Sequence, residues 1–351
     1  MRVRTDAPLA PLTTIRLGGA AASLVDVSSE DDLVEALRAA EGAAAPVFVL
    51  GGGSNVVVAD EGFPGAVLRV GIRGLSARRE SGRVVVDVGA GEDWDALVAR
   101  AVDEGWGGVA CMSGIPGLVG ATPIQNVGAY GQEVGDTIAS VRAYDRARGE
   151  FVDLDAADCR FAYRTSVFRG SGRFIVTGVR FAFEAGRDVT VRYAELARAL
   201  SVALEGCAPA REVRDAVVAL RRAKGMVVDP SDPESVSAGS FFVNPIVDAR
   251  GVLDIGRRAG APPPHFDAGE GRYKVAAAWL VERAGFARGW TQGRVGVSAK
   301  HALALVNRGG ATTRELLGAA RAIRRAVRER FGVTLEPEPV LVGCSWEEDD
   351  L

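Results

Sequence analysis

The stretch VFVLGGGSNVVV, residues 47–58, decides the fold of this 351-residue chain. The apolar run at 47–50 and the β-branched run at 56–58 each predict a strand, with a loop over 51–55 between them. Consecutive glycines accept positive φ and can present a row of main-chain N–H groups to an anion such as phosphate. A dinucleotide-binding G-x-G-x-x-G loop must open a helix, whereas this loop runs into a second strand. The stretch therefore predicts a strand–loop–strand phosphate site, with an ordinary tight turn as the alternative.

Helical and strand patterns alternate on both sides of this stretch. Ser29 precedes an amphipathic helix, and Thr312 with Glu315 forms the capping box of another. Further helices are expected over 94–105, 211–225 and 274–285, and further strands over 83–91, 138–144, 150–154, 174–183 and 333–343. Residues 226–238 are rich in Pro, Asp and Ser, which predicts a linker or mobile loop.

Composition excludes several function classes. The chain is 48% hydrophobic and 25% charged with a net charge of -3, which is typical of a globular protein and unfavourable for a nucleic-acid partner. Its 4 Cys are far apart and its 2 His are not near them, so no metal site is expected. No signal peptide or apolar run of membrane-spanning length is present. We therefore expect a cytoplasmic protein with no membrane partner.

A second glycine-rich segment covers residues 111–135. Gly114, Gly117 and Gly120 recur at intervals of three, and the run PIQNVGAYG follows at 123–131. Glycines allow a ligand to approach the backbone closely, and amide side chains fix its heteroatoms by hydrogen bonds. Two glycine-rich loops without a helix start suggest a nucleotide-like ligand held by main chain. A structural Ω-loop is the alternative here.

Three short clusters carry candidate reactive groups. Tyr163 and Arg164 open YRTSVFR, and an arginine fork matches a carboxylate or phosphate. Ser240 lies in SAGSFFVNP, where a hydroxyl with no histidine nearby in the sequence could still protonate a strongly basic carbanion. Glu336 and Glu338 alternate in LEPEP, so a strand there would place them on one face, although the prolines restrict it. A surface arginine, a helix-cap or turn serine and edge-strand charge are the respective alternatives.

Taken together and in this order, these motifs resemble the UDP-N-acetylenolpyruvylglucosamine reductases, the MurB family. The resemblance covers nearly the whole chain and rests on TTIRLGG, LGGGSN, IPGLVGATPIQNVGAYGQE, FAYRTSVF, SAGSFFVNP, KVAAAWLVERAGF and LEPEP. It implies an α+β protein with an FAD-binding fold of the vanillyl-alcohol-oxidase type, made of two α/β subdomains, plus a smaller α/β substrate-binding domain. The implied divisions are 1–72 rejoined by a C-terminal strand over 333–351, then 73–225, then 226–332.

The resemblance also implies a reaction. NADPH reduces FAD, and the reduced flavin delivers hydride to the enolpyruvyl ether of UDP-N-acetylglucosamine in peptidoglycan precursor synthesis. Arg164 and Glu338 would stabilise the resulting enolate-like anion, and Ser240 would protonate it.

Ligand-binding residues follow from the same correspondence. The implied FAD-binding residues are Gly51, Gly52, Gly53, Ser54, Asn55, Ile115, Gly120, Gln125, Asn126 and Gly128. The implied substrate-binding residues are Tyr130, Tyr163, Tyr193, Lys224 and Asn244. VTVRYAEL, which carries Tyr193, matches the subclass with a tyrosine-bearing loop over the substrate. Val243 and Val340 depart from the pattern, because many members have basic residues at these positions.

The partners implied are the enolpyruvyl UDP-sugar and NADPH, and the expected oligomeric state is a monomer. Two alternatives remain open at the level of sequence. One is another flavoprotein of this fold, an oxidase that acts on a different small molecule. The other is a non-catalytic UDP-sugar binder that retains the fold without the reaction.

Overall fold

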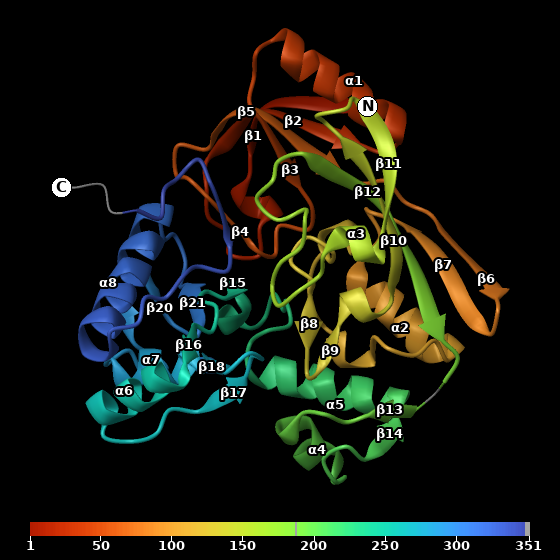
Figure 1. The fold of residues 1–351 in the computed structure, drawn as a ribbon. Coiled ribbons are helices and arrows are strands. Elements are labelled where there is room, and N and C mark those ends of the chain that lie inside the picture. The colour runs from red at the N-terminus through yellow and green to blue at the C-terminus, as the bar shows by residue number, and fades with distance from the viewer. Residues whose placement is uncertain (187, 348–351) are drawn as a thin grey trace. The chain divides into compact units, whose positions relative to one another are not determined.

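The computed structural model describes residues 1–186 and 188–347, and the chain divides into two compact units (Figure 1). The first unit comprises Met1–Thr5, Ser23–Gly52 and Gly65–Ala223. The second comprises Asp6–Ala22, Gly53–Pro64 and the chain from Lys224 onward. The chain passes between the units inside the GGGSN loop, so this loop contributes residues to both.

A five-stranded antiparallel sheet is the centre of the first unit, in the order β11-β10-β12-β7-β6. Its strands, in chain order, are β6 (Leu75–Glu80), β7 (Arg83–Gly89), β10 (Ile138–Asp145), β11 (Glu150–Asp155) and β12 (Phe174–Glu184). Buried residues alternate along much of β10 and β12, as expected for a sheet with one face in a core, whereas β7 buries residues 84–86 in succession. The short helix α3 (Ala156–Cys159) follows β11.

Helix α2 (Trp94–Glu104) packs against that buried face. It begins at Asp93, whose side chain accepts a hydrogen bond from the Ala96 N–H, and it ends at Gly105 with φ 73°. Trp94 is fully buried and its ring lies 6.3 Å from that of Phe181, which stacks on Phe183 at 5.3 Å. These aromatic contacts fix the helix over the sheet and so position the glycine-rich segment that follows it.

Two further layers complete the first unit. A four-stranded sheet has the order β1-β2-β5-β3, in which β3 (Val47–Leu50) pairs parallel with β5 (Phe63–Val70). The other strands are β1 (Arg2–Pro8) and β2 (Ala20–Val27), and helix α1 (Glu30–Gly42) buries its apolar stripe in the same core. A smaller cluster holds β13 (Asp188–Thr190), α4 (Ala194–Leu200), β14 (Cys207–Pro209) and α5 (Ala210–Ala223).

The second unit is built on an antiparallel sheet in the order β15-β21-β20-β19. The strands are β15 (Ser237–Ser240), β19 (Thr291–Gln292), β20 (Val295–Val297) and β21 (Ala304–Asn307). A second sheet is formed by β16 (Ile246–Asp248), β17 (His265–Asp267) and β18 (Arg272–Val275). Helices α6 (Ala249–Ala259), α7 (Ala277–Arg283) and α8 (Thr313–Phe331) pack with these sheets around one apolar core.

A parallel pair joins distant parts of the chain within the second unit. β4 (Val56–Val58), which follows the GGGSN loop, pairs with β22 (Val340–Val342) in the register Val56–Val340. The strand predicted over 333–343 is therefore wrong in its extent, because only its last part is a strand. Prolines at 337 and 339 remove main-chain donors and prevent a regular ladder before Val340.

Most of the other predicted elements are confirmed. The Ser29 side chain caps α1, and the Thr312–Glu315 capping box is formed at the start of α8. The strands predicted at 47–50 and 56–58 are β3 and β4. The linker predicted over 226–238 is wrong, because Glu234, Ser235 and Ser237 are buried there and β15 begins within it. The three-part domain division stays a prediction, and its residues 348–351 lie outside the described residues.

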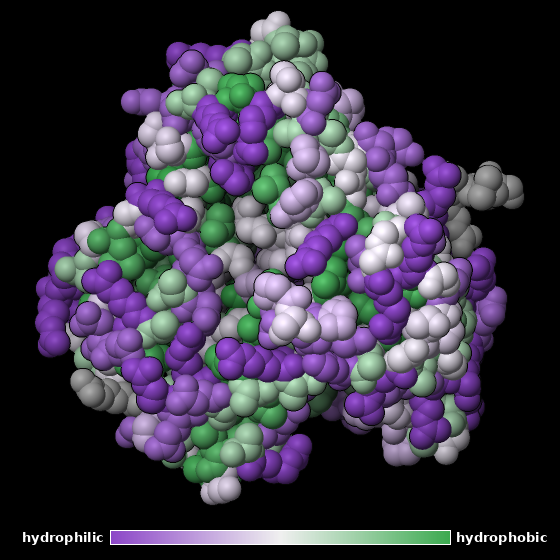
Figure 2. Space-filling model, turned by 180° about the vertical axis from the view of Figure 1, so that it is seen from behind, coloured by the Kyte–Doolittle hydropathy of each residue, from purple (hydrophilic) through white to green (hydrophobic). Residues whose placement is uncertain are grey.

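Hydrophilic residues make up much of the face shown in Figure 2, with hydrophobic residues interspersed among them. Large exposed apolar side chains include Leu253 and Phe266 of the second unit. None of the helices in the described chain is long and apolar enough to cross a membrane.

Candidate functional site

The two glycine-rich loops touch within the first unit. A Cβ atom on Gly52 would lie 2.6 Å from the Cα of Gly117, and one on Gly51 would lie 3.6 Å from the Cβ of Ala121. Gly117 has φ 126°, which L side chains rarely adopt. Among residues 1–186 and 188–347, the N–H groups of Gly52 and Gly117 donate to no protein acceptor. The contact thus leaves two main-chain donors available to a ligand, as both glycine motifs predict.

Other residues of the second glycine-rich segment hold the segment itself together. Asn126 is buried; its amide donates to Glu133 Oε2 at 2.7 Å and accepts from the Gly135 N–H at 2.9 Å. Because both ends of this side chain are engaged, contact of Asn126 with a ligand is left to its main chain. Gly120 is buried against Ala90, where a Cβ would come within 2.4 Å. Position 120 therefore requires glycine, because a side chain there would clash with Ala90.

The YRTS turn is attached to this same segment. Arg164 has φ 54° and donates from Nη2 to the carbonyl of Gly128 at 3.0 Å. Its guanidinium lies 5.6 Å from the centre of the Tyr163 ring. Ser166 Oγ donates to the carbonyl of Ile124 at 2.7 Å. These contacts bring Tyr163 and Arg164 beside residues 124–128, so the structure joins two motifs that are about forty residues apart in the sequence.

A tyrosine pair and a partly buried arginine lie in the same unit. The rings of Tyr130 and Tyr193 meet edge-to-face at 5.3 Å. Burial raises the pKa of Tyr130 and lowers the pKa of Arg221, whose charge interacts with Tyr130, Asp95 and Arg164. No sequence motif points to Arg221. An arginine within the amphipathic helix α5 gave no local signal, because only the packing of α5 buries it.

An ion pair ties α2, α5 and the glycine-rich segment together. Asp95 accepts from both terminal nitrogens of Arg214, at 2.6 and 2.9 Å, and from the Gly114 N–H at 2.6 Å. Burial alone would raise the pKa of Asp95, but the hydrogen bonds from Arg214 and Gly114 lower it overall. Asp95 thus fixes the start of the loop that contains Gly117.

The second unit brings Ser240 and Glu338 onto adjoining segments. The Glu338 N–H donates to the carbonyl of Phe241 at 2.8 Å, and the Val243 N–H donates to the carbonyl of Glu336 at 3.1 Å. The LEPEP segment therefore runs beside SAGSFFVNP, as neither motif alone indicates. Asn55 donates from Nδ2 to the carbonyl of Glu338 at 3.3 Å, which links the end of GGGSN to the same place.

Of the two LEPEP glutamates, Glu336 is exposed and Glu338 is partly buried. Glu336 is paired with Arg324 of α8 at 3.3 Å and is exposed, so it is a surface ion pair. Asn244 accepts the Ala277 N–H at 2.9 Å and so holds the start of α7. Its amide nitrogen donates to no acceptor among residues 1–186 and 188–347. Lys224 follows α5 and is partly buried. His301, which no motif singled out, lies beside Ser240.

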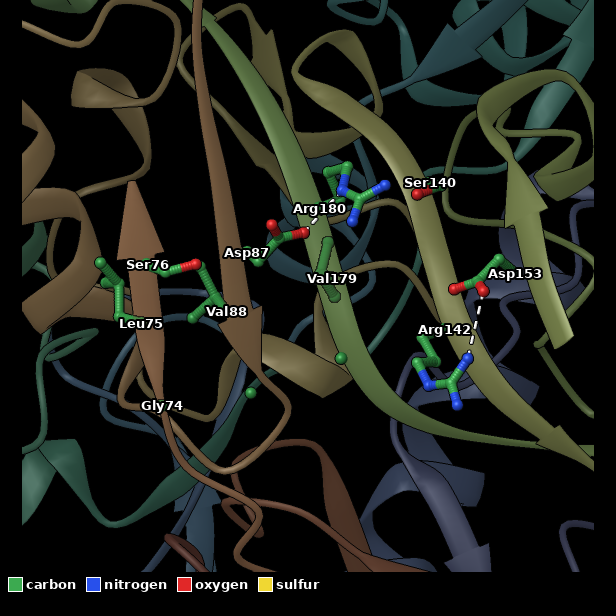
Figure 3. A pocket seen from close by; sticks show the side chains of 12 residues that line it. Gly74, Leu75, Ser76, Asp87, Val88, Ser140, Arg142, Asp153, Val179 and Arg180 are labelled. Atoms are coloured by element: carbon green, nitrogen blue, oxygen red, sulfur yellow. Dashed lines mark hydrogen bonds and ion pairs between the residues drawn. The ribbon is translucent and has the colours of Figure 1, made fainter. Parts of the chain in front are cut away.

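A cavity of about 370 Å³ lies elsewhere, on the outer face of the five-stranded sheet (Figure 3). Gly89 and Gly178, which pair across β7 and β12, are among its lining residues. Arg180 is paired with Asp87 at 2.6 Å and Arg142 with Asp153 at 3.1 Å. No predicted site residue lines this cavity, and its arginines are paired with carboxylates. The candidate groups are therefore the glycine loops of the first unit and, separately, the Ser240 region of the second.

Two family models match different parts of the chain. The model for the C-terminal domain of UDP-N-acetylenolpyruvoylglucosamine reductase matches residues 231–342, and an FAD-binding-domain model matches residues 21–155. The FAD-binding match includes both glycine-rich loops, and the C-terminal match includes Ser240 and Glu338.

Curated relatives and a solved structure resemble nearly the whole chain. The UDP-N-acetylenolpyruvoylglucosamine reductase of Thermobifida fusca is 51% identical, over 97% of this chain and 98% of its own. That of Salinispora arenicola is 49% identical, over 96% and 95%. A crystal structure of the Thermus caldophilus enzyme has a TM-score of 0.66 and 26% identity, over 97% and 99%.

Proposed function

The chain belongs to the UDP-N-acetylenolpyruvoylglucosamine reductase family, and from this premise we propose which of its residues carry the family's reaction. The chain is an FAD-dependent oxidoreductase that reduces the enolpyruvyl ether of UDP-N-acetylglucosamine to UDP-N-acetylmuramate, a step of peptidoglycan precursor synthesis. NADPH is the reductant. The observation that carries the assignment of roles is the pairing of SAGSFFVNP with LEPEP, which supports a shared site for Ser240 and Glu338.

The residues present fit FAD. Gly52 and Gly117 lie in contact and keep N–H donors free of protein acceptors in the described chain. Main-chain N–H groups on glycine suit a diphosphate, since they donate without side chains in the way. We propose that Gly51, Gly52, Gly53 and Ser54 bind the diphosphate region, and that Ile115, Gln125 and the main chain of Asn126 line the rest. Asn55 and Gly120 support these loops through their own contacts.

When bound and reduced, FAD supplies the hydride that reaches the terminal vinyl carbon of the substrate. The adjacent carbon then carries negative charge that spreads into the substrate carboxylate. Arg164 offers a fixed positive charge to that anion, and its bond to Gly128 holds its fork in place. Glu338 acts as a second stabilising group, and Ser240 donates the proton that completes the reduction.

Substrate binding falls to residues around these groups. Tyr130 and Tyr193 form an edge-to-face pair, and Tyr193 is 40% exposed, which supports a role in covering the substrate. Lys224 offers a charge for the substrate diphosphate. Asn244, within SAGSFFVNP, and Tyr163, beside Arg164, contribute hydrogen-bonding groups. We further propose that the protein acts in the cytoplasm as a monomer.

The test begins with an absorbance spectrum under anaerobic conditions. We expect a flavin spectrum that bleaches with NADPH and recovers when enolpyruvyl-UDP-N-acetylglucosamine is added. Bleaching without recovery would contradict the substrate and favour an oxidase of the same fold. Protein that binds UDP-sugar but takes up no flavin would favour a non-catalytic binder.

A variant then tests the proton donor. Ser240→Ala removes the hydroxyl, so flavin reduction by NADPH should be unchanged while reoxidation by the enolpyruvyl substrate slows strongly. Ser231→Ala is the matched control, because Ser231 is an exposed turn residue whose hydroxyl and N–H both donate to Asp229 Oδ1. Reoxidation of the Ser240→Ala flavin at the wild-type rate would overturn the role of Ser240.

A further inference from the structure

Ser240 and His301 lie side by side in the second unit although they are 61 residues apart in the chain. β15 and β21 pair antiparallel with Ser240 opposite Ala304, and His301 opens the turn that leads into β21. Ser240 Oγ lies 3.5 Å from His301 Nε2. Both residues are partly buried.

A hydrogen bond at the other ring nitrogen of His301, Nδ1, shows which of the two nitrogens carries the proton. The Leu303 N–H donates to His301 Nδ1 at 3.2 Å. A nitrogen that accepts a hydrogen bond bears no proton, so the neutral imidazole has its proton on Nε2. Nε2 is the nitrogen that faces Ser240. His301 is therefore the donor in this contact and Ser240 Oγ is the acceptor.

The turn that carries His301 is anchored by acidic residues. Glu234 accepts the Ala299 N–H at 2.7 Å and also binds Arg308 at 2.9 Å. Asp232 binds Lys300 at 2.8 Å. The Ala304 N–H closes the turn on the His301 carbonyl at 3.1 Å. Because these bonds hold the residues before and after His301, they restrict the position of its imidazole.

We propose that His301 is a positioning residue that acts through Ser240, an inference that rests on the proposed function. By donating to Oγ, the imidazole occupies one lone pair of the serine and leaves the hydroxyl proton to point to the substrate. It also stabilises the charge that the serine acquires when it gives up this proton. The contact is long, as hydrogen bonds at catalytic groups often are before a substrate is bound, and it should shorten when the acceptor becomes an anion.

The proton transfer balances without a further reactant. The O–H bond of Ser240 breaks, its proton forms a C–H bond at the carbanionic carbon, and the electron pair of that carbanion becomes the new bond. The electron pair of the O–H bond remains on Oγ as an alkoxide, which accepts the Nε2–H of His301. A water molecule from solvent then returns a proton to Oγ.

Single variants give the first part of the test. His301→Ala should slow flavin reoxidation by enolpyruvyl-UDP-N-acetylglucosamine about 100-fold, the usual effect of losing one donor to an oxyanion, with flavin reduction by NADPH unchanged. His301→Gln keeps an N–H donor and should recover most of the rate. His265→Gln is the matched control: His265 is exposed and bonds to the Pro263 carbonyl, and its loss should change neither half-reaction.

A double-mutant cycle separates this role from a merely structural one. If His301 acts through Ser240, then adding His301→Ala to Ser240→Ala should cause no further loss, because the acceptor is already gone. A further loss of about 100-fold in the double variant would overturn the proposal. Reoxidation of the His301→Ala flavin at the wild-type rate would overturn it as well.

The failure of this proposal is distinguishable from the failure of the proposed function. Wild-type flavin that the enolpyruvyl substrate does not reoxidise would contradict the function itself. A functional wild type with a defective Ser240→Ala and an unaffected His301→Ala would contradict only the role of His301. If His301→Ala does not fold, the comparison of Ser240→Ala with Ser240→Ala/His301→Gln decides, and any added loss in the latter speaks against the proposal.

Discussion

Gly52 and Gly117 are in main-chain contact, and a Cβ on the first would lie 2.6 Å from the Cα of the second. The contact joins the loop after β3 to the loop after α2, each of which carries an N–H that no described protein group accepts. Since real Cβ atoms do not approach so closely, one of the two loops must move if Gly52 gains a side chain. The consequences of such a shift can be measured.

Gly52→Ala should weaken FAD binding and lower the free energy of unfolding by about 1 to 3 kcal/mol, because the loops are forced apart. FAD affinity from flavin fluorescence and urea denaturation would measure the two effects. Gly318→Ala is the matched control: Gly318 lies within α8 with nothing near its Cβ position, so alanine should stabilise the helix by about 0.5 to 1 kcal/mol. Equal changes in FAD affinity and in the free energy of unfolding for the two variants would contradict the prediction.

Arg164→Ala should leave flavin reduction by NADPH intact and slow reoxidation by the enolpyruvyl substrate about 100-fold or more, since a fixed charge at the developing anion is lost. Stopped-flow absorbance separates the two half-reactions. Arg148→Ala is the control, because Arg148 makes an exposed ion pair with Glu150 in a hairpin. A variant that loses both half-reactions equally would indicate a structural role for Arg164.

Asp95→Asn should destabilise the protein by about 1 to 2 kcal/mol at pH 7, a value that allows for the 35% exposure of the Asp95 side chain. Because the folded-state pKa of Asp95 is lowered, its stabilisation is present above the unfolded pKa of about 3.9. The stabilisation is lost as the pH falls through the folded pKa, so the difference between wild type and variant should shrink below about pH 4. Urea denaturation at a series of pH values measures this difference in the free energy of unfolding.

Asp103→Asn provides the comparison for this prediction. Asp103 and Arg211 also join α2 to α5, but both side chains are more than half exposed. Exposed ion pairs of this kind contribute at most about 1 kcal/mol to the free energy of unfolding. A loss at Asp103 as large as that at Asp95 would show that burial does not set the strength of these bridges.

Cys207 should be the first thiol to react with a thiol reagent in the folded protein. It is exposed, whereas burial raises the pKa of Cys111 and of Cys159 to about 12 and both are buried. Mass spectrometry after brief labelling should locate the modification on Cys207, and Cys207→Ser should greatly reduce native-state labelling. Modification of Cys111 before Cys207 would contradict the packing described for the first unit.

The local parts of the structure could be predicted from the sequence, and the non-local parts could not. Ser29, Asp93 and Thr312 cap helices by contacts within four residues, so their patterns are visible in the sequence. The contact between Ser240 and His301 depends on the register of β15 and β21, which no local pattern specifies.

Motif resemblance predicted candidate residues but not how each is used. Asn126 matches a ligand-binding motif, yet its amide is committed to Glu133 and Gly135. The PSDPES run has the composition of a linker, yet Glu234 anchors it to Arg308 and to the turn before His301. Composition reports the tendency of a segment to turn, whereas burial depends on partners far along the chain.

The parallel pairing of β4 with β22 has a consequence for the order in which the protein forms during translation. Asn55 and Glu338, which flank this pairing, are separated by 283 residues. β4 emerges from the ribosome early and stays without its neighbour until residues 340–342 have followed. The segment after the GGGSN loop is therefore completed only when nearly all of the chain has been synthesised, and a nascent chain that stops short of Val340 exposes an unpaired apolar strand to aggregation.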